Sequence, residues 1–258
     1  MSGEDFEDGA VDLTVRPATE DDLPEIAELF IATRRDAVPL MPPTVSGDAE
    51  IREWFTRTGP SKEIWVAEDS EIAGFAMLDG PWLEALYVGP QRQGTGVGSL
   101  LLDLAKAQRP DGFGLWVFAS NTHARGFYHR HGLVELEHTD GSANAERSPD
   151  VRMAWPGTAP LAYLRGQIDA VDDELALLLA RRFALTAAVQ GFKETPGQPG
   201  RDSDRESEIA ARMAAHAPGL GEAAIGRIMH AVIGESLDAY EQGRKPGSEH
   251  RSPSARWE

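Results

Sequence analysis

The second half of the chain carries a long run of regularly spaced apolar positions that is interrupted once. From Leu161, the spacing alternates between three and four residues, through Leu164, Ile168, Val171, Leu175, Leu178, Leu185, Val189 and Phe192. Such spacing is typical of a helix that packs along one stripe. The position that the pattern skips is Arg182, so a permanent cation stands in the predicted packing seam. We therefore predict one long helix over residues 159–194. The cation within its apolar seam indicates a functional role for that position.

Two further helices are predicted after this one. The proline- and glycine-rich segment 196–200 ends the long helix, and helical periodicity returns over about 204–217 and 221–242. In the last of these segments an apolar stripe is continued by Ser236; its members are Ile225, Met229, Val232 and Ile233. Strand patterns are absent from this half, which predicts an all-helical domain of three helices.

The first half of the chain alternates short β-rich runs with helical stretches. The β-rich runs are residues 64–67, 72–77, 83–88, 114–118 and 151–155. The segment 154–160 contains two prolines and a glycine, and it separates the two patterns. We therefore predict an α/β domain over residues 12–156 and a helical domain over residues 157–242. The two ends of the chain, residues 1–11 and 243–258, are predicted to be disordered tails.

Composition limits the partners of the protein. Residues 1–157 carry 13 Lys/Arg against 27 Asp/Glu, and residues 158–258 carry 12 against 15. This balance disfavours nucleic acid as a partner, and the relative enrichment of cations in the second half suits a small anionic ligand. The absence of cysteine excludes disulfides and thiolate metal sites. Without an apolar run of about 18 residues or a signal-peptide pattern, we expect a cytoplasmic protein with no membrane partner.

A glycine-rich turn follows the predicted strand at 83–88. Glycines at 94, 96 and 98 let the backbone approach a ligand closely. The helix that begins there presents unpaired N–H groups and the positive end of its dipole to an anion. A pyrophosphate fits such a turn, and an ordinary strand-to-helix connection is the alternative.

Two motifs together resemble the GNAT superfamily of acetyl-CoA-dependent acyltransferases. They are the Q-x-x-G-x-G turn at residues 91–96 and the N-x-x-A-x-x-x-Y helix at residues 121–128. The resemblance covers residues 12–156 and implies a mixed sheet flanked by helices, with acetyl-CoA as the cofactor. It also implies a coenzyme A site, whose pyrophosphate is held by backbone amides, at Leu86, Val88, Gln91, Gln93, Gly94, Thr95, Gly96, Val97, Gly98, Ser99 and Asn121.

The same resemblance suggests roles for two side chains. Tyr128 matches the tyrosine that often protonates the departing thiolate, and Glu84 lies where relatives often supply a base to an acceptor amine. A carboxylate there takes the ammonium proton directly or through a water if burial raises its pKa; a solvated strand carboxylate is the alternative. The acceptor stays an unidentified amine. No metal is predicted, and surface or packing roles are expected for His123, His129 and His131.

The cations of the long helix cannot all serve one site within a single chain. Lys193 lies eleven residues beyond Arg182, on almost the same face and about 16 Å along the axis, so both can reach one small anion. Arg165 lies seventeen residues before Arg182, about 26 Å away and off that face. If Arg165 serves the same ligand, it comes from the antiparallel helix of a second subunit. That arrangement predicts a two-fold dimer with two equivalent sites.

The order of these residues resembles the all-helical AroQ type of chorismate mutase across residues 160–242. The motif L-R-x-x-I-D-x-V-D-x-E-L-x-x-L-L-x-x-R ends at Arg182, and P-G-R-D-S-D-R-E (199–206) and V-I-G-E-S (232–236) follow. The resemblance implies a homodimer that converts chorismate to prephenate without a cofactor. Its site combines Arg165 from the partner subunit with Arg182, Lys193, Asp202, Arg205, Glu206, Ser236 and Tyr240.

The resemblance also implies a role for each group. Arg165 and Arg182 bind the substrate carboxylates, Lys193 faces the ether oxygen, and Ser236 touches a carboxylate. Asp202 and Glu206 lie near the substrate hydroxyl, although Ser203-x-x-Glu206 also fits a helix-capping box. A Claisen rearrangement needs its substrate held folded and the charge on the ether oxygen stabilised, which arginines and a lysine supply without a nucleophile or a metal.

One departure from the family pattern leaves the substrate open. Tyr240, with Glu241 beside it, stands where the family usually has Gln or Glu bonded to the ether oxygen. A mutase or lyase acting on 4-amino-4-deoxychorismate or isochorismate is one alternative. A dimerisation or metabolite-sensing module that regulates the acetyltransferase is another. Fusion of the two domains suggests an acceptor from an aromatic amino acid or shikimate-derived pathway.

Overall fold

The computed structural model describes residues 13–192, 202–217 and 219–243 and divides the chain into two compact units. The first unit reaches Gly166 and the second begins at Gln167. Both residues lie in one helix, α5 (Pro160–Gly191). The tail predicted at 1–11, the helix break at 196–200, Lys193 and residues 244–258 of the tail predicted at 243–258 fall outside the described residues. Gly243, the first residue of that predicted tail, is instead the last residue of the final helix.

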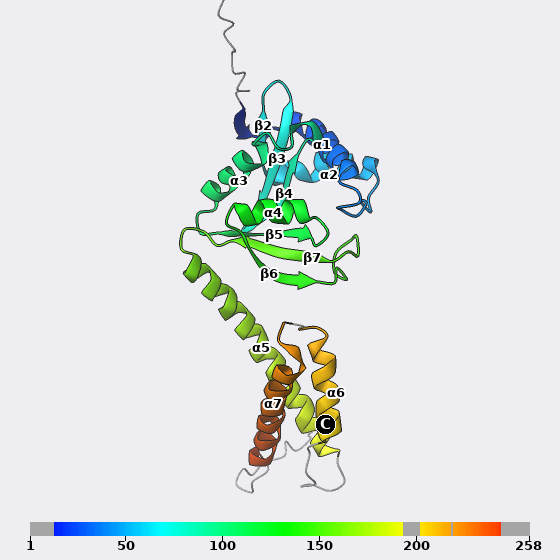
Figure 1. The fold of residues 1–258 in the computed structure, drawn as a ribbon, viewed down its shortest axis with the longest axis vertical. Coiled ribbons are helices and arrows are strands. Elements are labelled where there is room, and N and C mark those ends of the chain that lie inside the picture. The colour runs from blue at the N-terminus through cyan, green and yellow to red at the C-terminus, as the bar shows by residue number, and fades with distance from the viewer. Residues whose placement is uncertain (1–12, 193–201, 218, 244–258) are drawn as a thin grey trace, which may run out of the picture. The chain divides into compact units, whose positions relative to one another are not determined.

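The first unit is built on a seven-stranded sheet of order β1-β2-β3-β4-β5-β7-β6 (Figure 1). Neighbouring strands are antiparallel except β4 and β5, which are parallel and pair only at Trp82 and Gly114, so the sheet opens beyond that point. The strands are β1 (Thr14–Pro17), β2 (Glu63–Glu68), β3 (Ile72–Asp79), β4 (Trp82–Val88), β5 (Phe113–Phe118), β6 (Val134–Thr139) and β7 (Asp150–Trp155).

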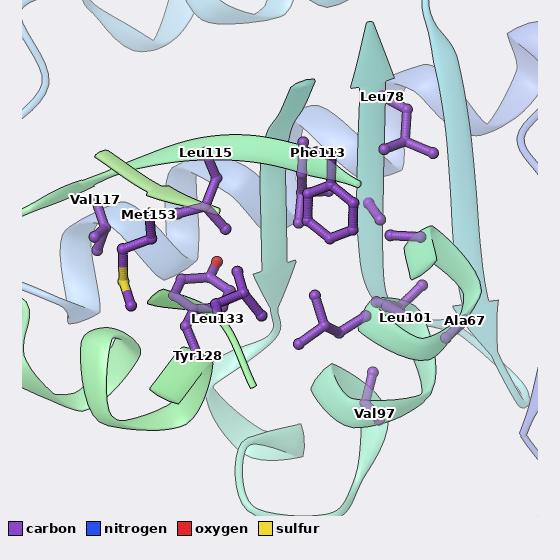
Figure 2. Close-up of a cluster of buried hydrophobic side chains, with 14 of the residues drawn as sticks. Ala67, Leu78, Val97, Leu101, Phe113, Leu115, Val117, Tyr128, Leu133 and Met153 are labelled. Carbon is purple, nitrogen blue, oxygen red and sulfur yellow. The ribbon is translucent and has the colours of Figure 1, made fainter. Parts of the chain in front are cut away.

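Helices cover both faces of this sheet because its central strands are apolar on both sides. Along β3, Phe75 and Met77 pack with the helices of one face, and Ala76 and Leu78 pack with those of the other. Figure 2 shows part of the buried cluster that contains Leu78. The first face carries α1 (Leu23–Asp36) and α2 (Asp48–Thr58), and the second carries α3 (Val97–Gln108) and α4 (Thr122–Arg130). The predicted α/β fold of mixed sheet and flanking helices is confirmed.

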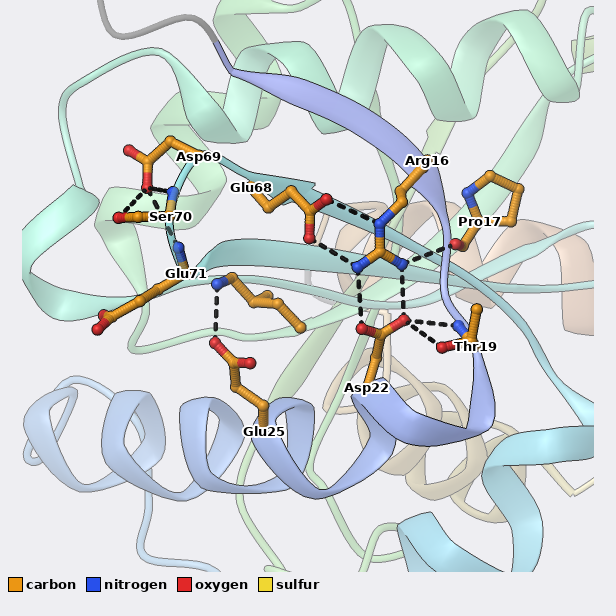
Figure 3. A network of polar contacts seen from close by, with 10 residues as sticks. Arg16, Pro17, Thr19, Asp22, Glu25, Glu68, Asp69, Ser70 and Glu71 are labelled. Carbon is orange, nitrogen blue, oxygen red and sulfur yellow. Dashed lines mark hydrogen bonds and ion pairs between the residues drawn. The ribbon is translucent and has the colours of Figure 1, made fainter.

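A network of charged side chains fixes the first strand to its neighbours (Figure 3). The Arg16 guanidinium donates to Asp22 at 2.6 and 2.9 Å and to Glu68 at 2.6 and 2.8 Å. Asp22 ends the short helix η1 (Glu20–Asp22) ahead of α1, and Glu68 lies on β2. The hydrogen bonds from Arg16 hold the pKa of Asp22 well below its usual range. The network therefore joins three elements at the edge of the sheet.

The second unit contains most of α5 together with α6 (Ser203–Ala214) and α7 (Gly221–Gly243). These three helices confirm the predicted all-helical architecture. A small core joins α6 and α7; its buried members are Ala210, Ile225 and Met229. By contrast, α5 buries none of its residues in the single chain. Its predicted seam is 50% to 69% exposed at Leu161, Ile168, Val171, Leu175, Leu178, Leu185 and Val189.

Candidate functional sites

A cavity of about 880 Å³ opens where β4 and β5 separate in the first unit. Its walls come from both strands, from the start of α3 and from α4. Most of the predicted coenzyme A residues line it, namely Leu86, Val88, Gln93, Gly94, Gly96, Gly98, Ser99 and Asn121. Gln91, Thr95 and Val97 are outside its lining. Val97 is fully buried in the core, and the Thr95 hydroxyl donates to the Arg92 carbonyl at 2.7 Å.

The glycine turn has the geometry of an anion cradle. Gly94 and Gly96 adopt left-handed backbone with φ of 77° and 95°, which favours glycine. A side chain at either position would meet no atom within 4 Å, so the turn faces open space. Gly96 is the N-cap of α3 and offers no side-chain cap to the first-turn N–H groups. Those groups are available to a phosphate, which makes the turn fit a pyrophosphate.

Tyr128 contributes a buried phenol to the lining of this cavity. Figure 2 shows its ring among the buried side chains of the core. Tyr128 lies on α4, whose N-cap is Asn121; the Asn121 side chain accepts from the Ala124 N–H at 3.1 Å. The Tyr128 side chain packs in the core and is 8% exposed. Within residues 13–192, 202–217 and 219–243, its hydroxyl makes no hydrogen bond. Because burial raises the pKa of Tyr128 well above its usual value, the phenol stays protonated at neutral pH and can donate to a ligand.

Glu84 lies at the same cavity but already has a partner. Its carboxylate is 3.0 Å from the Lys62 ammonium, which also contacts Asp79 at 2.5 Å. Asp79 first and Glu84 second raise the pKa of Lys62. The Glu84 side chain is 34% exposed. An incoming ammonium group would therefore compete with the Lys62 ammonium for the Glu84 carboxylate.

The histidines fall into different environments. His131 lines the cavity, with Nε2 3.1 Å from the Ser99 hydroxyl and Nδ1 2.9 Å from the Phe127 carbonyl. His123 also lines the cavity, whereas His129 contacts Glu135 at 3.1 Å on the surface. Among the described residues, no three potential ligands gather into a metal site. The contact between His131 and Ser99 is a cavity feature that the sequence did not reveal.

The sequence also missed Arg34, the most buried charged group of the cavity. Arg34 lies on the buried face of α1 and is 5% exposed. Its Nη2 donates to the Glu146 carboxylate at 3.0 Å and to the Pro42 carbonyl at 3.1 Å. The guanidinium also lies over the Phe118 ring, 5.3 Å from its centroid. The signal in the sequence was a cation in line with an apolar helical stripe, the same signal that drew attention to Arg182.

In the second unit, α5 and α7 bring two predicted site residues together. The Arg182 guanidinium donates to the Ser236 hydroxyl at 2.8 Å. Ser236 donates in turn to the Val232 carbonyl at 2.6 Å and is 2% exposed. Arg182 is half-buried. A cation and a buried hydroxyl far apart in the sequence thus form one polar centre.

The remaining predicted residues of this unit lie around α6 and α7. Asp202 is the N-cap of α6 and accepts from the N–H groups of Asp204 and Arg205 at 3.1 and 3.0 Å. The predicted capping box at Ser203 is therefore wrong, because α6 begins there and the residue before it caps the helix. Glu206 instead contacts His230 of α7 at 3.1 Å.

Three further predicted site residues lie on three different helices. Arg205 pairs with Glu208 at 3.0 Å on the surface. Tyr240 lies one turn beyond Ser236 on α7 and is half-buried. Arg165 is exposed on α5 and belongs to the first unit. In the part of the chain that the structure describes, no helix is long and apolar enough to cross a membrane.

Comparisons with known proteins match each unit separately. The family model for the acetyltransferase (GNAT) domain matches residues 60–135, and that for chorismate mutase type II matches residues 164–241. The peptidyl-lysine N-acetyltransferase YjaB of Salmonella typhimurium is 35% identical over 110 residues, which cover 42% of this chain and 75% of the relative.

Two more distant similarities are to a curated protein and to a solved structure. The peptidyl-lysine N-acetyltransferase YiaC of Escherichia coli is 26% identical over 157 residues, which cover 55% of this chain and 96% of the relative. The solution structure of apo-form YjaB from Escherichia coli is similar with a TM-score of 0.46 and 22% identity, covering 57% of this chain and 99% of that one.

Proposed function

Since the chain belongs to the GNAT acetyltransferase family and also carries a type II chorismate mutase domain, we propose that it is a bifunctional enzyme. The first unit transfers an acetyl group from acetyl-CoA to an amine. The second rearranges chorismate to prephenate and needs no cofactor. The boundary between the two activities is proposed at residues 156 and 157, after the last strand of the sheet.

The contact between Arg182 and Ser236 carries the mutase proposal. It places a guanidinium beside a buried hydroxyl, which suits a small carboxylate once the Ser236 proton turns to it from the Val232 carbonyl. Arg182 and Ser236 bind one substrate carboxylate, and Lys193 faces the ether oxygen. Glu206 and Asp202 face the substrate hydroxyl, with Arg205 and Tyr240 completing the site. Clamping the substrate supplies the folded geometry, and the cations stabilise the charge that develops on the oxygen.

A homodimer completes this site in the proposal. The exposed seam of α5 supports it, because a soluble monomer seldom exposes a continuous apolar stripe of this length. Arg165 is about 26 Å from Arg182 along an ideal helix and cannot reach the same ligand from the same chain. The antiparallel α5 of a second subunit brings its Arg165 to the site. Each dimer then holds two equivalent sites.

The acetyltransferase proposal assigns acetyl-CoA to the cavity between β4 and β5. The turn at Gly94 and Gly96 holds the pyrophosphate through backbone N–H groups. Tyr128 donates its proton to the departing thiolate, and Glu84 takes a proton from the acceptor ammonium, directly or through a water. Relatives named peptidyl-lysine N-acetyltransferases support a lysine side chain as the acceptor amine.

One experiment tests the mutase proposal. Purified protein is mixed with chorismate, and loss of its ultraviolet absorbance is followed, with acid conversion of the product to phenylpyruvate. Enzyme-like turnover is expected. Parallel assays with 4-amino-4-deoxychorismate and isochorismate are informative because Tyr240 stands in place of the family Gln or Glu. Preference for either analogue, or binding without turnover, would contradict the chorismate assignment.

A second experiment tests the acetyltransferase. Acetyl transfer releases the thiol of coenzyme A, which a thiol-reactive dye detects directly. The chain has no cysteine, so the protein adds no background to this assay. Acetyl-CoA and a lysine-containing peptide should release thiol in proportion to the peptide acetylated, as checked by mass spectrometry. Thiol release without peptide acetylation would contradict the proposed transfer.

A further inference from the structure

A serine and a histidine meet at the edge of the proposed coenzyme A site. Ser99 lies in the first turn of α3, shortly after Gly96 of the glycine turn. Its hydroxyl is 3.1 Å from Nε2 of His131, the residue that follows α4. Both residues line the cavity, and both are half-buried. The proposed acetyl transfer uses neither side chain, yet the hydroxyl lies beside the place proposed for the pyrophosphate.

The surroundings of His131 decide which of its ring nitrogens carries the proton. Nδ1 is 2.9 Å from the Phe127 carbonyl oxygen, which can only accept a hydrogen bond, so Nδ1 is the N–H of the neutral ring. Nε2 then carries a lone pair and accepts the proton of Ser99. The imidazole also packs on the Phe127 ring, with centroids 4.4 Å apart, which holds it in this orientation. While His131 is neutral, the Ser99 hydroxyl donates to it.

A phosphate beside Ser99 changes this arrangement of hydrogen bonds. The charged oxygens of a phosphate accept hydrogen bonds, and the Ser99 hydroxyl has a single proton to donate. If that proton turns to the phosphate, the lone pair of Nε2 faces the lone pairs of the hydroxyl oxygen. A proton on Nε2 removes this conflict. The imidazolium then donates through both nitrogens, to the Phe127 carbonyl and to Ser99, and its charge lies near the phosphate.

The charged groups around His131 favour the neutral ring until an anion binds. Lys106 of α3 donates to the His131 carbonyl oxygen at 2.9 Å, and its ammonium is 3.6 Å from the exposed Asp103. Arg130, the adjacent residue, is exposed and also lines the cavity. Within the described part of the chain, His131 forms no ion pair with a carboxylate. Nearby cations disfavour a charged imidazole, so an anionic ligand supplies the missing counter-charge.

We propose that His131 takes up a proton when a phosphate-bearing ligand binds, so that Ser99 donates to the phosphate and the imidazolium donates to Ser99. The proton comes from solvent, forms the Nε2–H bond, and returns to solvent when the ligand leaves. This inference rests on the proposed acetyl-CoA site and adds a positioning residue to it. Histidine is the side chain that ordinarily changes charge between pH 5 and 8, so the affinity for the ligand should fall as pH rises through this range.

Calorimetry in two buffers of different ionisation enthalpy counts the protons that are taken up on binding. The probe is 3′-dephospho-coenzyme A, since the 3′-phosphate of coenzyme A is a phosphomonoester, which itself titrates near about pH 6. The pyrophosphate of the probe keeps its charge over this range. Near pH 7, about half a proton or more should be taken up per site, and the Kd should rise about threefold per pH unit. Binding of the probe without proton uptake would overturn the proposal.

Two histidine variants locate the proton. His131→Gln keeps a neutral N–H group that can donate to Ser99, so binding should persist near pH 7 while proton uptake falls to about a tenth of a proton or less. His123→Gln is the matched control, because His123 is an exposed histidine in the lining of the same cavity. It should keep the full uptake. Uptake that survives in His131→Gln, or that is lost in His123→Gln alone, would refute the role of His131.

Two further measurements keep the test decisive. With coenzyme A itself as the probe, the difference between the unmodified protein and His131→Gln cancels the titration of the ligand. If His131→Gln does not fold, nitrogen NMR of the imidazole rings in the unmodified protein reports the charge of His131 directly. A ring that stays neutral in the complex near pH 7 would reject the proposal.

The outcomes also separate this inference from the function on which it rests. Binding of the probe without proton uptake would reject the inference and leave the acetyltransferase proposal in place. Proton uptake at His131 without acetyl transfer from acetyl-CoA would keep the inference and reject that proposal. Failure of the probe, coenzyme A and acetyl-CoA to bind would reject both.

Discussion

At the scale of single residues, two arginines stand in apolar stripes and differ in how their charge is balanced. Burying a guanidinium costs several kcal/mol unless hydrogen bonds and opposite charge compensate for lost water. Arg34 has Glu146 as a counter-charge at 3.0 Å. Arg182 meets the Ser236 hydroxyl, which supplies a hydrogen bond but no charge. The charge of Arg34 is therefore already balanced within the protein, whereas the charge of Arg182 suits an anion.

Arg182 offers a sharp test because an arginine precedes it on the same helix. Arg182→Ala should lower chorismate turnover about a hundredfold or more, since a substrate carboxylate would be left desolvated and unpaired. Arg181→Ala removes an exposed arginine and should leave turnover within about twofold. Steady-state kinetics of both variants, with circular dichroism as a check on folding, make the comparison. Equal losses in the two variants would contradict a carboxylate contact at Arg182.

Tyr128 can be tested with a second phenol as the control. Tyr128→Phe removes a buried proton donor from the cavity and should lower kcat for acetyl transfer by about a hundredfold, the usual lower range for a general acid. The KM for acetyl-CoA should change little, because the ring still fills its place in the core. Tyr163→Phe, at a half-buried tyrosine packed on Gly112, should keep full activity. Loss of acetyl-CoA binding in Tyr128→Phe would instead indicate a packing role.

At the scale of elements, the predictable strands are those with apolar side chains on both faces. The five predicted β-rich runs correspond to β2, β3, β4, β5 and β7. The strands β1 and β6 were not predicted. Both are edge strands with few buried side chains, and β1 is fixed by Arg16 through partners that are distant in sequence, such as Glu68. Local pattern carries no information about such long-range ion pairs.

The same limit explains what could be predicted of the cavity. The turn at 91–96 and the helix at 121–128 were recognised because their residues are close in sequence. Arg34 was missed because its partner Glu146 is 112 residues away and because it stands next to an exposed arginine. The opening between β4 and β5 depends on where two strands stop pairing, which no single stretch of sequence encodes.

The Arg16 network predicts a pH dependence for the stability of the first unit. Arg16 lowers the pKa of Asp22 in the folded state, so this carboxylate stabilises the fold at pH values above the ordinary carboxyl pKa of about 4. The contribution is lost as pH falls through the lower folded pKa. Asp22→Asn should therefore cost about 1 kcal/mol at pH 7, a value discounted for partial exposure, and progressively less below about pH 4.

Denaturant unfolding at several pH values measures this effect. Asp21→Asn is the control because Asp21 is exposed and adjacent. It should leave the free energy of unfolding within about 0.5 kcal/mol across the range. A loss from Asp22→Asn that is the same at pH 3 and pH 7 would show that Asp22 acts through shape and not through its charge.

At the scale of the whole molecule, the exposed seam of α5 decides whether the protein acts as a dimer. Val171→Lys places a charge in the seam, where Val171 is 58% exposed in the single chain. It should convert the proposed dimer to a monomer in sedimentation velocity and abolish mutase turnover, while acetyl transfer persists. Ala170→Lys makes the same change in charge one residue away, on the outward side of the heptad pattern. It should stay dimeric and active.

The proposed dimer predicts that each mutase site contains residues from both subunits. Arg165→Ala and Arg182→Ala should each be inactive as a mutase when pure. In a mixed dimer, one of the two sites pairs an intact Arg165 from one subunit with an intact Arg182 from the other.

If the subunits exchange randomly, half of the dimers are mixed and half of their sites are complete, so about a quarter of normal activity should return. Differently tagged variants allow the mixed dimer to be purified and assayed alone, where about half of normal activity is expected. Inactivity of that purified dimer would show that each subunit builds its site by itself, and the 26 Å between these residues on one helix would then exclude Arg165 from the substrate.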